Sequence, residues 1–229
     1  MEFERERLLI GEKVDYLKEK TVLVLGLGGV GGYVVEALAR AGIGHLILID
    51  YDVVDITNIN RQIIALHSNI GKKKTACFKE RINDINPRCI VDILDIFFNT
   101  DNKDIIFDYQ IDYIVDCCDS LNSKKILIEE SYKRSIPIIS SMGTGNKLHP
   151  ELFRITELKK TEYDPLARKL RMLLKNQKEL LNTKVLYSKE EPLPFKGKIG
   201  SISYVPSVAG LMLAAYVIND LLEGWKENG

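Results

Sequence analysis

Residues 24–32 read VLGLGGVGG: the end of an apolar strand, a glycine-rich turn and the start of a helix. Gly26, Gly28 and Gly31 satisfy the spacing G-x-G-x-x-G, and Gly29 removes a further side chain from the turn. In such a turn, backbone N–H groups at a helix N-terminus can bind an anion, and the helix dipole adds attraction. The stretch therefore predicts a phosphate-binding turn, and leaves open whether the ligand is ATP or a dinucleotide.

Strands and helices alternate around this turn. Apolar runs with β-branched residues predict buried strands, and apolar residues at helical spacing predict helices. This alternation predicts an α/β fold with a Rossmann-like, doubly wound, mainly parallel sheet and right-handed crossovers. The expected strands are Thr21–Leu25, His45–Ile49, Cys89–Leu94, Asp112–Cys117 and Pro137–Ser141, and the expected helices are Val30–Ala41, Lys72–Ile85 and Asn122–Arg134.

The alternation ends after Gly145. Proline and glycine punctuate Glu190–Ser203, which predicts a mobile loop. We expect a single domain over residues 1–229, with a nucleotide-binding core over 20–145 and substrate-binding and dimerisation elements over 146–229. Antiparallel C-terminal additions to the sheet are expected, from the two strands Leu152–Thr156 and Lys184–Tyr187. The other expected C-terminal elements are the basic helix Pro165–Asn176 and the apolar helix Val205–Leu222.

Composition sets few limits on function. Lys and Arg number 32, as do Asp and Glu, so net charge neither favours nor excludes a nucleic-acid partner. The four cysteines form no C-x-x-C pair, and no zinc site is expected. Met1–Arg5 lacks a signal-peptide pattern, and Pro206 and the short length of Val205–Leu222 favour a buried or dimer-interface helix over an integral membrane segment. These features fit a reducing cytoplasm.

Polar residues behind the glycine turn narrow the choice of ligand. Asp50 ends the second expected strand, where a carboxylate can bind ribose hydroxyls. Arg61 and Lys74 can neutralise a triphosphate, and Asp119 follows the fourth expected strand, at the same edge of the sheet. There it can hold Mg²⁺, which prefers one or two carboxylates plus phosphate oxygens. The set favours nucleotidyl transfer from MgATP over hydride transfer by an NAD-dependent oxidoreductase.

The order of these motifs resembles the ubiquitin-activating-enzyme-like (E1-like) superfamily of adenylating enzymes. The resemblance covers about Arg5 to Ser141 and rests on G-x-G-G-V-G, Asp-x-Asp, Asn-x-Asn-Arg-Gln, Gly-x-x-Lys and Asp-x-x-Asp. Within the superfamily, the chain looks most similar to bacterial tRNA threonylcarbamoyladenosine dehydratases. That likeness extends along nearly the whole chain, through EALARAGIG at 36–44, DITNINRQ at 55–62 and VPSVAG at 205–210.

The resemblance implies roles for individual residues. Arg61, Lys74 and Asp119 are expected to be catalytic, with Asp119 as the metal ligand. Arg5 matches an arginine that reaches the triphosphate of a partner subunit, which implies a homodimer. The residues expected to bind ATP are Gly26, Gly28, Gly29, Gly31, Asp50, Asp52, Asn58, Arg61, Gln62, Lys74, Asp119 and Ser120.

The implied reaction is ATP-dependent dehydration of threonylcarbamoyladenosine in tRNA. The threonyl carboxylate attacks the α-phosphate of MgATP, and the carbamoyl group then closes a ring and expels AMP. Because that nucleophile is already tethered, effective molarity replaces a nucleophile from the protein. The sequence leaves open whether a sulfur-delivery or cysteine desulfurase partner takes part.

Two other functions stay open. An activator of a sulfur-carrier or ubiquitin-like protein would share the whole ATP site, although the chain has no cysteine beyond Cys118 for a thioester. A non-catalytic nucleotide-binding scaffold would also keep the glycine turn.

A tRNA substrate requires a basic surface. Residues 159–184 carry an excess of Lys and Arg, including Arg168 and Arg171, which suits phosphate contacts. Tyr163 and Tyr187 are candidates for stacking on an unpaired base. The alternative is an amphipathic helix with a solvated charged face, and the family resemblance favours tRNA.

Overall fold

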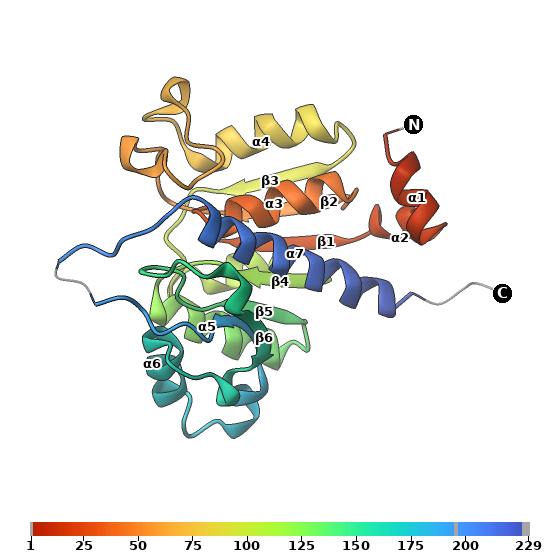
Figure 1. Cartoon of the computed structure of the whole chain (residues 1–229). Coiled ribbons are helices and arrows are strands. Elements are labelled where there is room, and N and C mark those ends of the chain that lie inside the picture. Colours follow the sequence, from red (N-terminus) through yellow and green to blue (C-terminus); the bar gives the residue numbers. More distant parts are fainter. Residues whose placement is uncertain (1, 195–196, 226–229) are drawn as a thin grey trace.

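A seven-stranded sheet forms the centre of the computed structural model, which describes residues 2–194 and 197–225 (Figure 1). The strands lie in the order β3-β2-β1-β4-β5-β7-β6, and neighbouring strands are parallel except for β6 and β7. This arrangement confirms the predicted α/β class with an antiparallel C-terminal addition. The strands are β1 (Thr21–Leu25), β2 (His45–Ile49), β3 (Ile90–Leu94), β4 (Tyr113–Asp116), β5 (Ile138–Ser141), β6 (Phe153–Glu157) and β7 (Lys184–Ser188).

The strand order reverses between β1 and β4. From β1 the chain builds β2 and β3 on one side, and β4 and β5 on the other. Leu25 at the end of β1 pairs with both Ile49 of β2 and Asp116 of β4, so these three strands finish level with one another. Ligands of open α/β sheets bind at the carboxyl ends of strands beside such a reversal.

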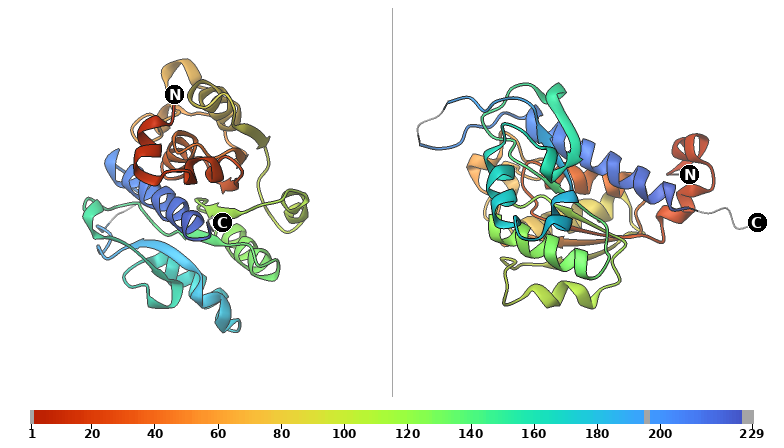
Figure 2. Two further views of the ribbon diagram at one scale, coloured as in Figure 1. Left: turned by 90° about the vertical axis from the view of Figure 1, so that its right-hand side faces the viewer. Right: turned by 90° about the horizontal axis from the view of Figure 1, so that it is seen from below.

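Helices cover both faces of the sheet (Figure 2). The helices α3, α4 and α7 pack on one face, and α5 and α6 on the other. The expected helices are present with shifted ends, and the two short N-terminal helices were not predicted. The helices are α1 (Glu4–Ile10), α2 (Lys13–Leu17), α3 (Gly31–Arg40), α4 (Lys74–Ile85), α5 (Leu121–Lys133), α6 (Pro165–Leu173) and α7 (Tyr204–Glu223).

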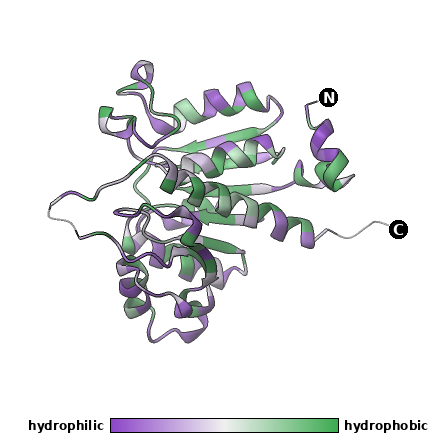
Figure 3. Ribbon diagram, viewed as in Figure 1, coloured by the Kyte–Doolittle hydropathy of each residue, from purple (hydrophilic) through white to green (hydrophobic). Residues whose placement is uncertain are grey.

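Side chains of the central strands alternate between two cores. In β1, Val22 and Val24 contribute to the core under α3 and α7, whereas Leu23 and Leu25 contribute to the core under α5. Successive strand residues point to opposite faces, and both faces are covered here. This explains the unbroken apolar runs of the two central strands β1 and β2, TVLVL and HLILI, and the green colour of much of the sheet in Figure 3.

The apolar helix α7 belongs to the core. Its Gly210 lies against α3, where an added Cβ would come within 2.3 Å of the Val30 carbonyl oxygen. By length and composition α7 could cross a membrane, but 44% of its apolar window is buried inside the protein. This helix therefore has the character of a core helix, and the expected buried face is present.

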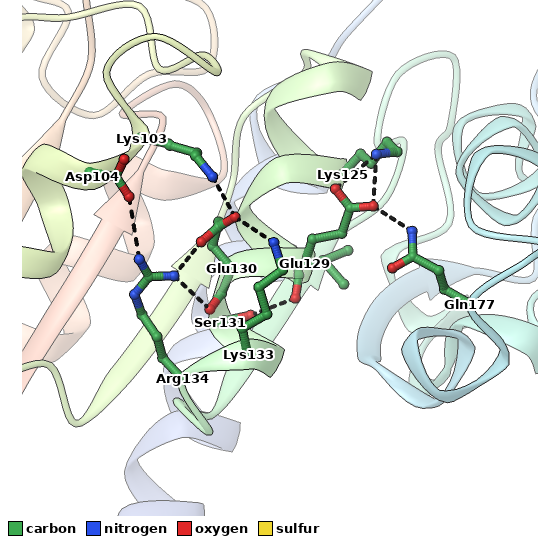
Figure 4. Close-up of polar contacts among 10 residues, drawn as sticks. Lys103, Asp104, Lys125, Glu129, Glu130, Ser131, Lys133, Arg134 and Gln177 are labelled. Carbon is green, nitrogen blue, oxygen red and sulfur yellow. Dashed lines mark hydrogen bonds and ion pairs between the residues drawn. The ribbon is translucent and has the colours of Figure 1, made fainter.

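The helix α5 carries a cluster of ion pairs around Glu130 (Figure 4). The Glu130 carboxylate accepts hydrogen bonds from Lys103 at 2.7 Å, Lys133 at 2.9 Å and Arg134. The bond from Lys103 above all holds the pKa of Glu130 at about 2, against the effect of its burial.

We expect Glu130→Gln to lower the free energy of unfolding by about 1–3 kcal/mol at pH 7, because hydrogen bonds to a charged group are lost. The pKa of Glu130 is lowered on folding, so its contribution is present above about pH 4.5 and disappears as the pH falls toward 2. Urea denaturation of the wild type and the variant should give curves that converge over this range. The exposed Glu80→Gln serves as the control, and a pH-independent difference would contradict the assignment.

Candidate functional site

A cavity of about 990 Å³ opens at the carboxyl edge of the sheet. It lies where β1, β2 and β4 finish level, and residues from the following loops line it. Apart from Gly31, each residue expected to bind ATP lines this cavity: Gly26, Gly28, Gly29, Asp50, Asp52, Asn58, Arg61, Gln62, Lys74, Asp119 and Ser120.

The glycine turn is shaped by close backbone contacts. Gly26 has φ +88°, and a Cβ there would lie 2.8 Å from the Cys118 nitrogen. A Cβ on Gly31 would lie 1.8 Å from the Gly26 carbonyl oxygen, so Gly31 is a packing position beneath the turn and does not line the cavity. Gly28 faces open space: a Cβ built there would have Gln62 Nε2, at 3.9 Å, as its nearest neighbour. A ligand can therefore approach the backbone at Gly28.

The Asp50 carboxylate fixes the turn from below. One oxygen accepts a hydrogen bond from the Leu27 backbone at 2.6 Å, and the other accepts one from the Asp52 backbone at 2.8 Å. Each carboxylate oxygen keeps acceptor capacity for a further donor such as a ribose hydroxyl.

Lys74 and Arg61 bring positive charge to the cavity. The buried Lys74 Nζ lies 2.8 Å from Asp52 Oδ2. The Arg61 guanidinium donates to the Thr57 carbonyl at 2.8 Å and to Asn60 Oδ1 at 2.9 Å, which holds its head group at the cavity wall. Both residues line the same cavity.

Three carboxylates surround the Tyr51 phenol in this region. Asp52 has the largest effect in raising the pKa of Tyr51, followed by burial, Asp119 and Asp50. The acidic groups thus gather on the side of the cavity that follows β2 and β4, next to the positive charge of Lys74.

A buried ion pair supports the turn that carries Asp119. Asp116 and Lys124 are fully buried, 3.0 Å apart, and Ser140 donates to the same carboxylate at 2.5 Å. The other Asp116 oxygen accepts the Cys118 backbone N–H at 3.2 Å. Burial is the largest single effect and lowers the pKa of Lys124. The charge and hydrogen bond of Asp116, together with Cys118 and Cys117, outweigh it, so the pKa is raised and the lysine stays charged. Sequence analysis missed Lys124, because a lysine on an amphipathic helix usually faces water.

The thiols of Cys117 and Cys118 also line the cavity. Burial, reinforced by the negative charge of Asp116, raises the pKa of both thiols. They are therefore protonated, and a thiolate nucleophile is disfavoured at this position.

Arg5 lies away from the cavity of its own chain. It is an exposed residue of α1, which precedes β1 and lies on the opposite side of the molecule from the loop between β7 and α7 (Figure 1). Any contact between Arg5 and a triphosphate therefore requires a second copy of the chain.

The expected basic surface is only partly present on α6. Arg168 is exposed, as are Lys169 and Lys175, but Arg171 donates to the carbonyl and hydroxyl of Thr161 within the fold. The helix also ends at Leu173, three residues earlier than expected.

The two tyrosines proposed for base stacking differ in exposure. Tyr163 is 63% exposed, whereas Tyr187 is 3% exposed and packs in the core beneath α6. The prediction for Tyr187 was wrong, because both faces of β7 are covered and leave no outward position.

The loop expected to be mobile is anchored on both sides. The Asn146 side chain accepts the Gly200 N–H at 2.7 Å, and Asn60 donates to the Ser201 carbonyl at 3.0 Å. Residues 195–196 of this loop lie outside the described residues.

Known proteins match the chain over its length. The model of the ThiF family matches residues 3–228. The tRNA threonylcarbamoyladenosine dehydratase of Bacillus subtilis is 41% identical over 97% of this chain and 95% of its own length. The Escherichia coli dehydratase is 42% identical over 73% of this chain and 63% of that protein.

Solved structures agree with the sequence matches. The structure of the E. coli tRNA N6-threonylcarbamoyladenosine dehydratase TcdA in complex with ATP superimposes with a TM-score of 0.93. The match has 35% identity and covers 100% of this chain and 96% of that one. The likeness to these dehydratases that the motifs indicate is thus confirmed, and the chain belongs to the ThiF family.

Proposed function

We propose that this protein is an ATP-dependent tRNA threonylcarbamoyladenosine dehydratase that works through an acyl-adenylate. The main support is that one cavity collects Arg61, Lys74 and Asp119 around a phosphate-binding glycine turn. The extended match to the B. subtilis dehydratase supports the same assignment.

The cavity has features that fit ATP. Gln62 lines the cavity, and its Nε2 is the nearest atom, at 3.9 Å, to a Cβ built on Gly28. This amide can therefore donate a hydrogen bond to a phosphate that approaches the turn. The open space at Gly28 admits phosphate against the backbone.

Magnesium fits the acidic side of the same cavity. Asp119 is exposed there and supplies one carboxylate, and the phosphates of the nucleotide supply further oxygens. Asp119 would hold the metal there, and the charge of the metal would offset that of the leaving pyrophosphate.

The protein contributes mainly positioning and charge. Arg61 and Lys74 stabilise the negative charge that develops on the triphosphate as the substrate carboxylate attacks the α-phosphate. The tethered carbamoyl group completes the dehydration, so the protonated Cys117 and Cys118 have no nucleophilic role. In a homodimer, Arg5 would reach the triphosphate of the partner subunit. A cytoplasmic location is part of the proposal, because the proposed substrate is tRNA.

The direct test is turnover of tRNA that carries threonylcarbamoyladenosine. Purified protein, MgATP and modified tRNA should yield AMP, pyrophosphate and a tRNA nucleoside lighter by one water, as measured by mass spectrometry. The same tRNA without the modification should release no AMP. AMP release driven by a sulfur-carrier protein, and not by the modified tRNA, would overturn the proposal.

Exposed positive charge on and after α6 is expected to bind tRNA phosphates. Reversing two of these charges, with Arg168→Glu and Lys175→Glu, should weaken tRNA binding about tenfold or more and reduce its salt dependence by about two phosphate contacts. Filter binding at several salt concentrations measures both effects, and the affinity for ATP should not change. The exposed Lys79→Glu on α4 is the matched control. Unaltered tRNA binding would place the basic surface elsewhere.

A further inference from the structure

The cavity extends beyond the residues that surround the expected nucleotide. Its second part is lined by the loop after β5, including Gly143 and Lys147, and by the start of α6, including Asp164. Lys147 and Asp164 are each only 3% exposed. Charged side chains are rarely buried to this degree unless they are paired or bind a ligand.

Hydrogen bonds hold this pair in a fixed geometry. Lys147 Nζ donates to the Gly143 carbonyl at 2.8 Å and lies 3.4 Å from Asp164 Oδ2. Asp164 in turn accepts the Gly143 N–H at 3.0 Å, and its other oxygen caps α6 through the Ala167 N–H at 2.9 Å. The Asp164 carboxylate is thus committed to the backbone on both oxygens.

Lys147 has donor capacity to spare. An ammonium group has three N–H donors, and two of them have partners among the described residues. The other nearby acid, Glu190, is occupied by the backbone N–H groups of Leu148 and His149, at 2.9–3.1 Å. The third donor of Lys147 is therefore available to a group that enters the cavity.

A cation in this part of the cavity would favour the proposed reaction. The acceptor carboxylate and the triphosphate are both anions, so they repel each other as they approach. Arg61 and Lys74 lie at the glycine-turn part, next to the residues expected to hold phosphate. A further positive charge would draw the carboxylate toward the α-phosphate. Lys147, Lys169 and Lys198 all line the cavity, and Lys147 is the buried one of the three, held in a fixed position.

We propose that Lys147 binds the carboxylate of the acceptor and orients it for attack on the α-phosphate, with Asp164 as the positioning residue that holds the lysine. The inference rests on the proposed function and names the acceptor site within it. In the step itself, a carboxylate oxygen forms a bond to the α-phosphorus. The bond from that phosphorus to the bridging oxygen breaks, and pyrophosphate leaves with the electron pair. No proton moves, so Lys147 acts by its charge.

The proposal predicts a pH dependence. Burial lowers the pKa of Lys147 below that of an ordinary lysine, and the facing Asp164 and Glu190 only partly oppose this. Below that pKa the ammonium binds a carboxylate, and above it the neutral amine does not. As the pH increases, the KM for modified tRNA should therefore rise. This rise should begin at a lower pH than it would if the binding group were an exposed lysine.

The test compares Lys147→Met, Lys147→Arg and the exposed control Lys189→Met. Lys147→Met should raise the KM for modified tRNA about 10- to 100-fold, the range expected for one hydrogen bond to a charged group. Its Kd for ATP should stay within about twofold of the wild type. Lys147→Arg should recover part of the affinity and move the rise in KM to higher pH, and Lys189→Met should behave like the wild type.

Three results would overturn the inference. One is a normal KM in Lys147→Met. Another is an equal loss of ATP and tRNA binding together with a lowered melting temperature, which indicates a structural role. The third is a wild-type protein that releases no AMP with modified tRNA, which would overturn the proposed function and this inference with it. If the wild type turns over normally and the Lys147 variants do not behave as expected, only the role of Lys147 is overturned.

Discussion

Asp119→Ala is expected to abolish ATP-dependent activation, with a loss of about 10³-fold or more in the rate of AMP release. Asp119 lines the cavity, and in the proposed mechanism it would supply the carboxylate for magnesium, which would stabilise the charge on the leaving pyrophosphate. Because Asp119 is exposed, its removal leaves no buried group unpaired. The fold should therefore persist, with a melting temperature within about 2 °C of the wild type.

The measurement is AMP and pyrophosphate release with modified tRNA at saturating MgATP. Asp84→Ala, at an exposed position of α4, is the matched control and should retain full activity. Full activity of Asp119→Ala would remove this residue from the catalytic set. A loss of activity accompanied by unfolding would mean that the residue acts through the fold.

Lys124→Met is expected to lower the free energy of unfolding by about 3–5 kcal/mol. The substitution leaves the Asp116 carboxylate buried without its positive partner, and only Ser140 and the Cys118 backbone remain to satisfy it. A charge of this kind in an apolar interior is costly. The loop that presents Asp119 should loosen at the same time, so activity falls together with stability.

Urea denaturation at pH 7 measures this effect. The neighbouring Lys125→Met is the control, because it removes only a partly exposed pair with Glu129 on the same helix and should cost about 1 kcal/mol or less. Adding Asp116→Asn to Lys124→Met should recover part of the lost stability. Equal destabilisation by Lys124→Met and Lys125→Met would show that the buried pair contributes no more than a surface pair.

The fold was predictable because its signals are local. Each central strand is a short apolar run, and residues 24–32 mark the turn between the first strand and its helix. Parallel strands bring their carboxyl ends to one edge, so residues just after β2 and β4, such as Asp50 and Asp119, could be assigned to one site.

The missed residues depend on contacts between distant segments. Lys124 pairs with Asp116 across the junction of α5 and β4, and Lys147 meets Asp164 only when the loop after β5 folds against α6. The residues that flank Lys124 and Lys147 do not distinguish them from lysines that face solvent. Tyr187 was misjudged for a related reason. Its burial depends on α6 packing over Val185 and Tyr187 while Leu186 packs on the other face of β7, and the five residues KVLYS do not show this packing.

The protonated state of Cys117 and Cys118 affects how readily the protein is oxidised. A cysteine reacts with peroxides and disulfides through its thiolate, which is the attacking nucleophile, and these two thiols are held in the protonated form. Sulfur atoms at the cavity wall are thereby shielded from oxidative damage by their own surroundings. Catalysis at this site is expected to survive oxidative stress that would inactivate an enzyme with an ionised catalytic cysteine.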